Sequence, residues 1–181
     1  NDVVDLNMGG ETPPENNQPG IEEWSSYHTC LTSKDGRFLH VVFCYYNDNK
    51  KNVPEKFYNP RYKTNTDLNL KYNLYYVKVN LETSTVSNFA GENLQTPVDM
   101  VTANAKSKIW DTEWRGAGVP PDIIIDEHGN PAFLHVLSEN TPHEFNYYYV
   151  RYTDGKWKQT IIAPSNHRWN SCYLKLDTTG T

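Results

Sequence analysis

A chain of 181 residues is long enough for one or two domains with a substantial core, and its net charge of −5 argues against a nucleic-acid or acidic-membrane partner. The 13 Tyr, 5 Trp and 6 Phe, against only 2 Met, favour a β-rich fold, and no segment has the apolar spacing of an amphipathic helix. No apolar run reaches the length of a membrane span. These features predict an all-β protein with almost no helix, bound neither to nucleic acid nor to a membrane.

The first part of the chain is predicted to hold one four-stranded unit. Residues 1–24, rich in Asn, Pro and Gly, are typical of a loop or of the end of a preceding unit. Residues 25–90 then give a hairpin that turns at KDGR, a third strand NLYYVKV and a short fourth strand near VSNF. A long polar insertion, residues 47–72, separates the second strand from the third.

The second part follows the same plan after a long connection, residues 91–119. Residues 120–163 divide into four apolar runs, PDIIID, PAFLHVL, NYYYVRY and WKQTIIA, separated by EHGN, SENTPHEFN and TDGK. Residues 164–181 are predicted to begin a third unit, with SCYLKLD as its first strand and a turn near the end of the chain.

Two short sequence motifs recur in the same order and indicate an internal repeat. FLHV stands at residues 38–41 and again at 133–136, and YYV followed by a basic residue stands at 75–78 and again at 148–151. The first unit holds about 22 more residues between its second and third strands. Insertions of that size are tolerated on a surface and often serve function.

Turns alternate between the two edges of a four-stranded meander. The first-to-second and third-to-fourth turns are short in both units and share one edge, whereas the long loops and the connections between units share the other. Tight turns on one side and long loops on the other predict a single working face at the long-loop edge.

Three segments, WDTEWRGAGVPPDIIIDEHGNPAFLHV, NLYYVKVNLETSTVSNFAGENLQTP and HRWNSCYLKLD, resemble BNR-repeat (sialidase-like) β-propeller proteins, in particular the branch that contains ulvan-type polysaccharide lyases. The resemblance covers roughly Ser25 to Thr181. The Asp-box turn of that family, S-x-D-x-G-x-T-W, is degenerate here as NLETSTV (residues 80–86) and TDGKW (residues 153–157), which speaks against a sialidase in particular. The resemblance implies an all-β fold of four-stranded antiparallel blades.

A closed propeller of this kind needs about six to eight blades. This sequence supplies two blades and the start of a third, so we expect a partial propeller whose remaining blades come from the rest of the protein or from another chain. A lone pair of blades would leave strand edges and apolar faces in water.

The three cysteines and three of the six histidines are predicted to be structural. If Asp35-Gly36 is a two-residue turn, Cys30 pairs with Val41 and Cys44 points to the other face, which argues against a disulfide between them. The side chains expected to be structural are the buried thiols Cys30, Cys44 and Cys172, the strand histidines His40 and His135, and the turn histidine His128.

The predicted long-loop edge gathers histidines, arginines and aromatic residues, a combination that favours a shared site over unrelated loop residues. Aromatic faces suit the C–H face of a sugar ring, although the same aromatics would also anchor long loops, and a basic insertion in an acidic chain fits an anionic polysaccharide. The residues are His28, His143, His167, Arg61, Arg115, Arg168, Tyr58, Tyr62, Trp110, Trp114 and Trp169.

The resemblance implies a lyase that cleaves a uronate-containing, ulvan-like polysaccharide by β-elimination. The base would be His28 or His143, the acid Tyr58 or Tyr62, and the group that neutralises the uronate carboxylate Arg115 or Arg61. The substrate-binding residues would be Arg61, Trp110, Trp114, His167, Arg168 and Trp169.

Two other functions stay open from the sequence. Asp99, Asp111 and Glu113 leave room for a glycoside hydrolase, including a sialidase-like one, and a glycan-binding propeller would need no catalytic group. No CxxC or His-rich spacing suggests a metal site, and no cofactor is expected. An enzyme that degrades a polymer would be exported, so we expect a secreted or periplasmic protein.

Overall fold

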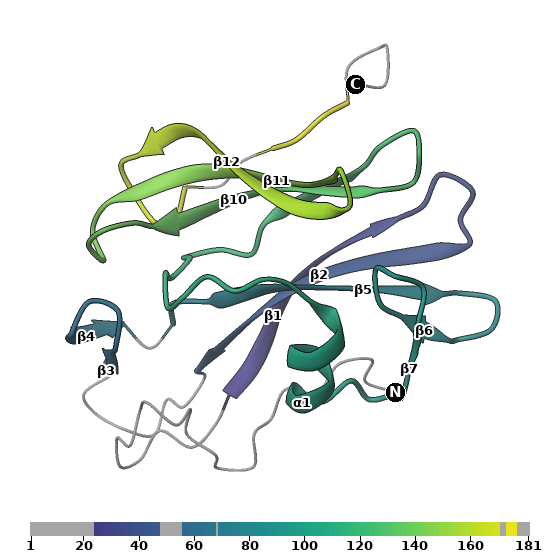
Figure 1. Cartoon of the computed structure of the whole chain (residues 1–181), viewed down its shortest axis with the longest axis horizontal. Helices are drawn as coiled ribbons and strands as arrows, with labels where there is room; N and C mark the ends of the chain where they lie inside the picture. The colour runs from purple at the N-terminus through teal and green to yellow at the C-terminus, as the bar shows by residue number, and fades with distance from the viewer. Residues whose placement is uncertain (1–23, 48–55, 68, 171–172, 177–181) are drawn as a thin grey trace.

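The computed structural model describes residues 24–47, 56–67, 69–170 and 173–176. Antiparallel strands dominate, with 53% of the described residues in strands and 6% in helix, which confirms the all-β prediction. The strands form two large sheets that lie face to face and one small sheet (Figure 1). The two helical segments in the described part of the chain are too short to cross a membrane.

The first large sheet has an all-antiparallel order, β1 (Trp24–Thr32), β2 (Phe38–Asn47), β5 (Tyr72–Asn80), β6 (Val86–Ser87) and β7 (Asn93–Leu94), and β8 (Lys108–Trp110) also pairs with β5. The predicted register of the first hairpin is confirmed, because Cys30 lies opposite Val41. Cys30 and Cys44 are both free thiols. Cys44 is buried as predicted, but Cys30 is exposed, which corrects that expectation; Cys172 lies outside the described residues.

The second large sheet is a four-stranded meander in chain order, β9 (Asp122–Ile125), β10 (Pro131–Ser138), β11 (Phe145–Thr153) and β12 (Lys156–Ser165). Residues 173–176 belong to the predicted first strand of a third unit, yet they form no strand here. They run beside β9 instead, where the Leu174 amide donates to the Asp122 carboxylate at 2.6 Å.

The two predicted connections contain regular structure that was not expected from the sequence. The insertion holds β3 (Lys56–Asn59) and β4 (Thr64–Asp67), and residues 91–119 hold β7, β8, α1 (Met100–Thr102) and a π-helical turn, η1 (Ala103–Ser107). The Asn59 side-chain oxygen accepts from the amides of Arg61 and Tyr62 and closes the β3–β4 hairpin. The Asp99 carboxylate caps α1 by accepting from the Thr102 amide at 2.7 Å. The β4 sequence TNTD has no apolar residue, so apolar periodicity could not detect it.

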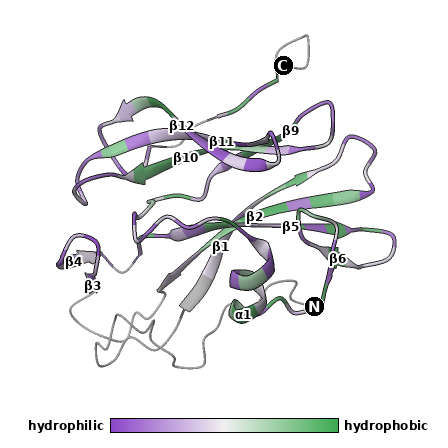
Figure 2. Ribbon diagram, in the orientation of Figure 1, coloured by the Kyte–Doolittle hydropathy of each residue, from purple (hydrophilic) through white to green (hydrophobic). Residues whose placement is uncertain are grey.

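The core consists of two apolar clusters on opposite faces of the first sheet. The hydropathy colouring of Figure 2 shows hydrophobic stretches along β2 and β10, which contribute to these clusters. The cluster between the large sheets includes Val42, Cys44, Leu74, Tyr76, Phe133, Leu137, Tyr148 and Val150. The cluster on the other face includes Val41, Phe43, Tyr75, Val77, Val98, Met100 and Ala103, with α1 and η1 as its cover. Strands β2 and β5 are therefore buried on both faces, and this explains their continuous apolar runs.

Truncating Phe133 tests the packing of the two sheets. The side chain is fully buried between them and its ring lies 6.2 Å from that of Tyr76 and 5.7 Å from that of Trp157. We expect Phe133→Ala to lower the free energy of unfolding by about 3–5 kcal/mol in urea denaturation. The matched control Leu81→Ala, in an exposed turn, should change it by less than about 0.5 kcal/mol. Equal effects of the two variants would contradict this packing.

Candidate functional site

Residues 110–118, here called the bridge segment, run along the long-loop edge of the first sheet. The Thr112 amide donates to the Asn73 side-chain oxygen at 2.9 Å, and the Asn73 amide donates to the Thr112 hydroxyl at 3.0 Å. Lys71 and Ala117 exchange both backbone hydrogen bonds at 2.8 Å. These four bonds hold the bridge segment against the start of β5.

The same segment is bound to the second sheet through Gly116 and Gly118. The Gly116 amide donates to the Ser138 hydroxyl at 2.8 Å, and the Ser138 amide donates to the Gly116 carbonyl at 3.0 Å. A Cβ on Gly118 would lie 2.3 Å from the Arg168 carbonyl oxygen, so only glycine lets the chain after β12 pass this closely. The bridge segment therefore links both sheets at the predicted working edge.

Arg115 lies on the bridge segment in a largely buried position. Its guanidinium donates to the Thr112 carbonyl and to the Tyr148 hydroxyl, both at 3.1 Å, and is 3.6 Å from the Glu139 carboxylate. The same group stacks over the Trp110 ring at 5.2 Å and the Tyr148 ring at 5.6 Å. Trp110 thus supports Arg115 rather than facing solvent.

Arg61 and Tyr62, in the turn between β3 and β4, meet the same loop after β10. The Tyr62 hydroxyl lies 2.7 Å from the Ser138 hydroxyl and donates to the Glu139 carbonyl at 3.1 Å. Arg61 is bound to the Glu113 carboxylate at 3.1 Å and stacks over the Tyr62 ring. Burial raises the pKa of the Tyr62 phenol, although the Ser138 hydrogen bond and the nearby arginines pull it downward. The phenol therefore keeps its proton and can act as an acid.

We call this group of residues the arginine cluster: Arg61, Tyr62, Glu113, Arg115, Ser138 and Glu139. Three segments that are far apart in the sequence meet in it. One oxygen of the Glu139 carboxylate is buried and accepts no hydrogen bond from the described residues. The cluster combines two guanidinium groups, a protonated phenol and two carboxylates, which can bind a carboxylate and move a proton.

A second cluster surrounds Lys71. Its ammonium group donates to the Asn69 carbonyl at 2.8 Å and lies over three aromatic rings, Tyr27 at 4.9 Å, Trp169 at 5.0 Å and Tyr46 at 5.3 Å. The residue is only 5% exposed. Burial lowers the pKa of the Lys71 ammonium to about 8, with nearby Arg168 acting in the same direction. We refer to these residues as the lysine cage.

The HRW stretch after β12 closes one side of the lysine cage. Arg168 forms an ion pair with Asp67 of β4 and stacks over the Trp169 ring at 5.2 Å. His167 is exposed, and its ring nitrogen Nδ1 accepts from the Trp169 amide at 3.1 Å. Arg168 and Trp169 thus lie at the long-loop edge, while His167 supports the turn.

The remaining predicted residues lie outside the arginine cluster, although His143 stands in the loop that begins at Glu139. His28 was expected at the long-loop edge, but it lies within β1 opposite Phe43. His143 is exposed in the loop between β10 and β11, and Tyr58 is exposed on β3. Trp114 packs against the Tyr72 ring at 5.2 Å and serves as an anchor of the bridge segment. Among the described residues, no histidine bonds to Arg61, Tyr62 or Arg115.

The remaining histidines and the short turns lie away from this edge. Asp35, His128 and Asp154 occupy short turns at the opposite edge, as predicted. His40 is buried and bonded to the Tyr76 hydroxyl at 2.6 Å. His135 is only partly satisfied, because its Nδ1 has no hydrogen-bond partner in the part of the chain that the structure describes and its Nε2 lies 4.0 Å from the Cys44 sulfur. Burial lowers the pKa of both histidines, to about 4 and about 3, so both remain neutral.

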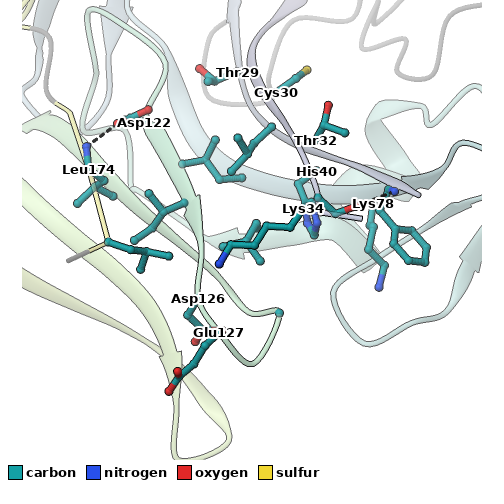
Figure 3. Close-up of a pocket in the computed structure, with 18 of the residues that line it drawn as sticks. Thr29, Cys30, Thr32, Lys34, His40, Lys78, Asp122, Asp126, Glu127 and Leu174 are labelled. Atoms are coloured by element: carbon teal, nitrogen blue, oxygen red, sulfur yellow. Dashed lines mark hydrogen bonds between the residues drawn. The ribbon is translucent and has the colours of Figure 1, made fainter. Parts of the chain in front are cut away.

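A cavity of about 940 Å³ lies elsewhere, between β1, β9 and residues 173–176 (Figure 3). Its apolar walls include Leu31, Ile123 and Ile125, and Asp122 is already bonded to the Leu174 amide. None of the predicted site residues lines it. We therefore place the candidate site at the arginine cluster. No group of His, Cys, Asp and Glu in the described ranges is arranged to hold a metal ion.

Six residues in or beside the two clusters were not predicted from the sequence: Lys71, Tyr27, Tyr46, Ser138, Glu139 and Tyr148. One signal was present for Lys71, because this lysine stands between Leu70 and Tyr72, directly before the run NLYYVKV that predicts a strand. Nothing local marked Ser138 or Glu139, whose roles depend on contacts with Tyr62 and the bridge segment.

Neither a protein-family model nor a curated protein matches this chain. Solved structures do share its fold. One is described as an ulvan lyase of a new polysaccharide lyase family, PL25, with a TM-score of 0.56 and 21% identity over 80% of this chain and 32% of that one. A second structure of such a lyase, bound to -[GlcA(1-4)Rha3S]-, gives the same values. The chain thus spans 32% of the length of these neighbours, and at 21% identity the likeness shows the fold alone.

The pH dependence of stability tests the burial of Lys71. The lysine pKa falls from 10.5 to about 8 in the folded protein, so between these values the unfolded chain binds more protons and stability rises with pH. We expect the free energy of unfolding of the wild type, relative to that of Lys71→Met, to increase from pH 8 to pH 10.5 by on the order of 3 kcal/mol.

Urea denaturation of both proteins across this pH range measures the difference. The variant Lys156→Met, at an exposed lysine, is the matched control. Its difference from the wild type in free energy of unfolding should not change with pH. A flat difference for Lys71→Met as well would contradict the cage geometry.

Proposed function

We propose that this chain is part of a β-propeller polysaccharide lyase that cleaves a uronate-containing, ulvan-like polysaccharide by β-elimination. The observation that carries the proposal is the arginine cluster, in which Tyr62 and Arg115 meet the same loop at the long-loop edge. The fold likeness to PL25 ulvan lyases, one of them bound to -[GlcA(1-4)Rha3S]-, supports this choice of chemistry.

The propeller part of the proposal rests on the arrangement of the sheets. Each large sheet contains an antiparallel meander, and the two pack face to face as neighbouring blades do. The first strands of the two meanders, β1 and β9, lie next to each other, as inner strands around a propeller axis would. The remaining blades would be supplied by the rest of the protein or by another chain.

The proposed reaction breaks the bond between the uronate C4 and its glycosidic oxygen. A base removes the proton at C5, next to the carboxyl group, the electrons of that C–H bond form the C4–C5 double bond, and the leaving oxygen takes a proton from an acid. Negative charge builds on the carboxylate during proton removal, so a guanidinium bound there lowers the barrier.

The structure favours particular residues for these roles. Tyr62 is the acid, because its phenol is protonated and belongs to the cluster, whereas Tyr58 does not. Arg115 neutralises the uronate carboxylate, with Arg61 beside it as a substrate-binding residue. His143 is the base, because its loop begins at Glu139 of the cluster, whereas His28 lies on β1.

The arrangement gives less support to a glycoside hydrolase. Asp99 caps α1, Asp111 is bound to Lys108 at 2.9 Å, and Glu113 is bound to Arg61 at 3.1 Å. Each carboxylate named for that function is thus already engaged. Because a polymer of this kind lies outside the cell, we also propose that the protein is secreted or periplasmic.

Absorbance near 235 nm, recorded with ulvan as substrate, separates the functions, because only a lyase creates an unsaturated uronate. We expect the absorbance to rise. New reducing ends without the absorbance would indicate a hydrolase, and binding without either would indicate a glycan-binding protein.

Replacing Arg115 tests the carboxylate-binding role. Lysine keeps the charge but not the planar fork of donors, so we expect Arg115→Lys to lower kcat by about a hundredfold or more in the 235 nm assay. His128→Ala, in a short turn at the opposite edge, is the control and should leave turnover nearly unchanged. Near-normal turnover of Arg115→Lys would remove this residue from the mechanism.

Replacing Tyr62 tests the acid. Tyr62→Phe removes the phenolic proton with little change in shape, and we expect kcat to fall by about 10²–10⁴ with a much smaller change in KM. The exposed Tyr173, changed to Phe, is the matched control. If Tyr62→Phe keeps its kcat while Tyr58→Phe loses it, the acid is Tyr58 instead.

A further inference from the structure

Lys71 is the one buried Lys or Arg in the described part of the chain, whereas several more exposed cations have a carboxylate partner. Each of Arg37, Arg61, Arg115, Arg168, Lys106, Lys108 and Lys158 is paired with an Asp or Glu. In the described part of the chain no carboxylate lies within ion-pair distance of Lys71, although the residue is only 5% exposed. Buried charges in proteins are ordinarily paired, so this ammonium group calls for a negative partner.

The ammonium group has unused capacity to bind an anion. Of its three N–H donors, one is directed to the Asn69 carbonyl, and the aromatic rings around it attract the charge without neutralising it. The neighbouring Arg168 adds a second cation, whose partner is Asp67. An oxyanion placed here would gain two charge-assisted hydrogen bonds.

The rim of the cage is aromatic and partly open to solvent. Tyr27 is 47% exposed and Trp169 is 38% exposed, and both rings lie about 5 Å from the Lys71 ammonium. Aromatic faces pack against the C–H face of a pyranose ring, while the cation would bind a charged substituent. Together these features fit a sugar ring that bears an oxyanion.

The cage also lies beside the arginine cluster. Lys71 is paired with Ala117, two residues along the bridge segment from Arg115, and Arg168 passes against Gly118. A polysaccharide held at Arg115 could therefore reach the cage with a neighbouring sugar. We infer that the lysine cage is a binding subsite for an anionic sugar, whose carboxylate or sulfate is held by Lys71 while its ring packs on Trp169 and Tyr27.

The position of this subsite next to the cleaved bond rests on the proposed lyase function, but binding itself does not. Binding to ulvan, measured by affinity electrophoresis at pH 7, provides the first test. All proteins carry Arg115→Lys to suppress turnover. Lys71→Gln should weaken binding by about tenfold or more, the scale of a lost charge-assisted contact, and the control Lys156→Gln should not.

Desulfated ulvan distinguishes the two sources of the anion. If Lys71 binds sulfate, desulfation of the polymer weakens binding by the protein that keeps Lys71 and leaves binding by Lys71→Gln unchanged. If it binds the uronate carboxylate, Lys71→Gln weakens binding to both polymers equally. Unchanged binding of both polymers by Lys71→Gln would overturn the inference and leave the cage a structural feature.

The pH dependence of the affinity for ulvan provides a second test, which compares the wild-type Lys71 with a variant that keeps the positive charge at this position. The groups facing Lys71 are Tyr27 of β1, Cys44 and Tyr46 of β2, and Arg168 and Trp169 after β12. Burial raises the pKa of the Cys44 thiol to about 12, so it stays neutral through the tested range. Because the pKa of Lys71 is about 8, affinity for ulvan should fall by about threefold or more from pH 7 to pH 9.5.

Lys71→Arg keeps its charge throughout and should lose this pH dependence. An identical pH dependence in Lys71→Arg would overturn the inference, even if Lys71→Gln fails to fold as judged by circular dichroism. The outcomes for the two functions are separable. Binding that depends on Lys71 without absorbance at 235 nm would reject the lyase and keep the subsite. Elimination with an unchanged KM in Lys71→Gln would reject the subsite and keep the lyase.

Discussion

The hydrogen bonds of the bridge segment hold the long-loop edge of this protein together. Through Thr112 and Ala117 it is bound to the first sheet, and through Gly116 to the second. Both clusters depend on it, because Arg115 lies on the segment itself and Lys71 is paired with it. The apolar cluster between the sheets fixes how far apart these anchor points lie. Small changes in sheet packing would therefore move the arginine cluster and the lysine cage together.

Charge compensation differs between the two clusters, and this difference suggests a division of roles. Arg61 and Arg115 are each partnered by a glutamate, so an incoming carboxylate must compete with Glu113 or Glu139. Lys71 has aromatic faces and one carbonyl instead. When an arginine exchanges one carboxylate for another, the additional cost in desolvation free energy is small. A buried lysine without a carboxylate partner is strongly stabilised by any anion that reaches it. In the proposed lyase, the first arrangement suits a reaction centre and the second suits recognition of a neighbouring sugar.

The insertion between β2 and β5 shows how a connection can complete a site. Its β3–β4 hairpin carries Arg61 and Tyr62 to the loop after β10, and Asp67 at the end of β4 holds Arg168. These polar contacts and the bond from the Asn59 side-chain amide to the Trp114 carbonyl hold the hairpin in place. The same insertion thus contributes to both clusters, which are otherwise built from different sheets.

Local chemistry in the sequence determined most strands of the two large sheets, the register of the first hairpin and the edge that holds the arginine cluster and the lysine cage. The KDGR turn set Cys30 opposite Val41, and alternating turn lengths placed Arg115 and Trp169 at the long-loop edge. The tertiary structure alone decided the partners within that edge. Tyr62 and Ser138 are 76 residues apart in the chain, and Lys71 meets Trp169 only because the chain after β12 passes Gly118. Apolar periodicity and turn geometry depend on residues close together in the sequence, so they can be predicted locally. Desolvation and charge pairing depend on which distant side chains are brought together by packing.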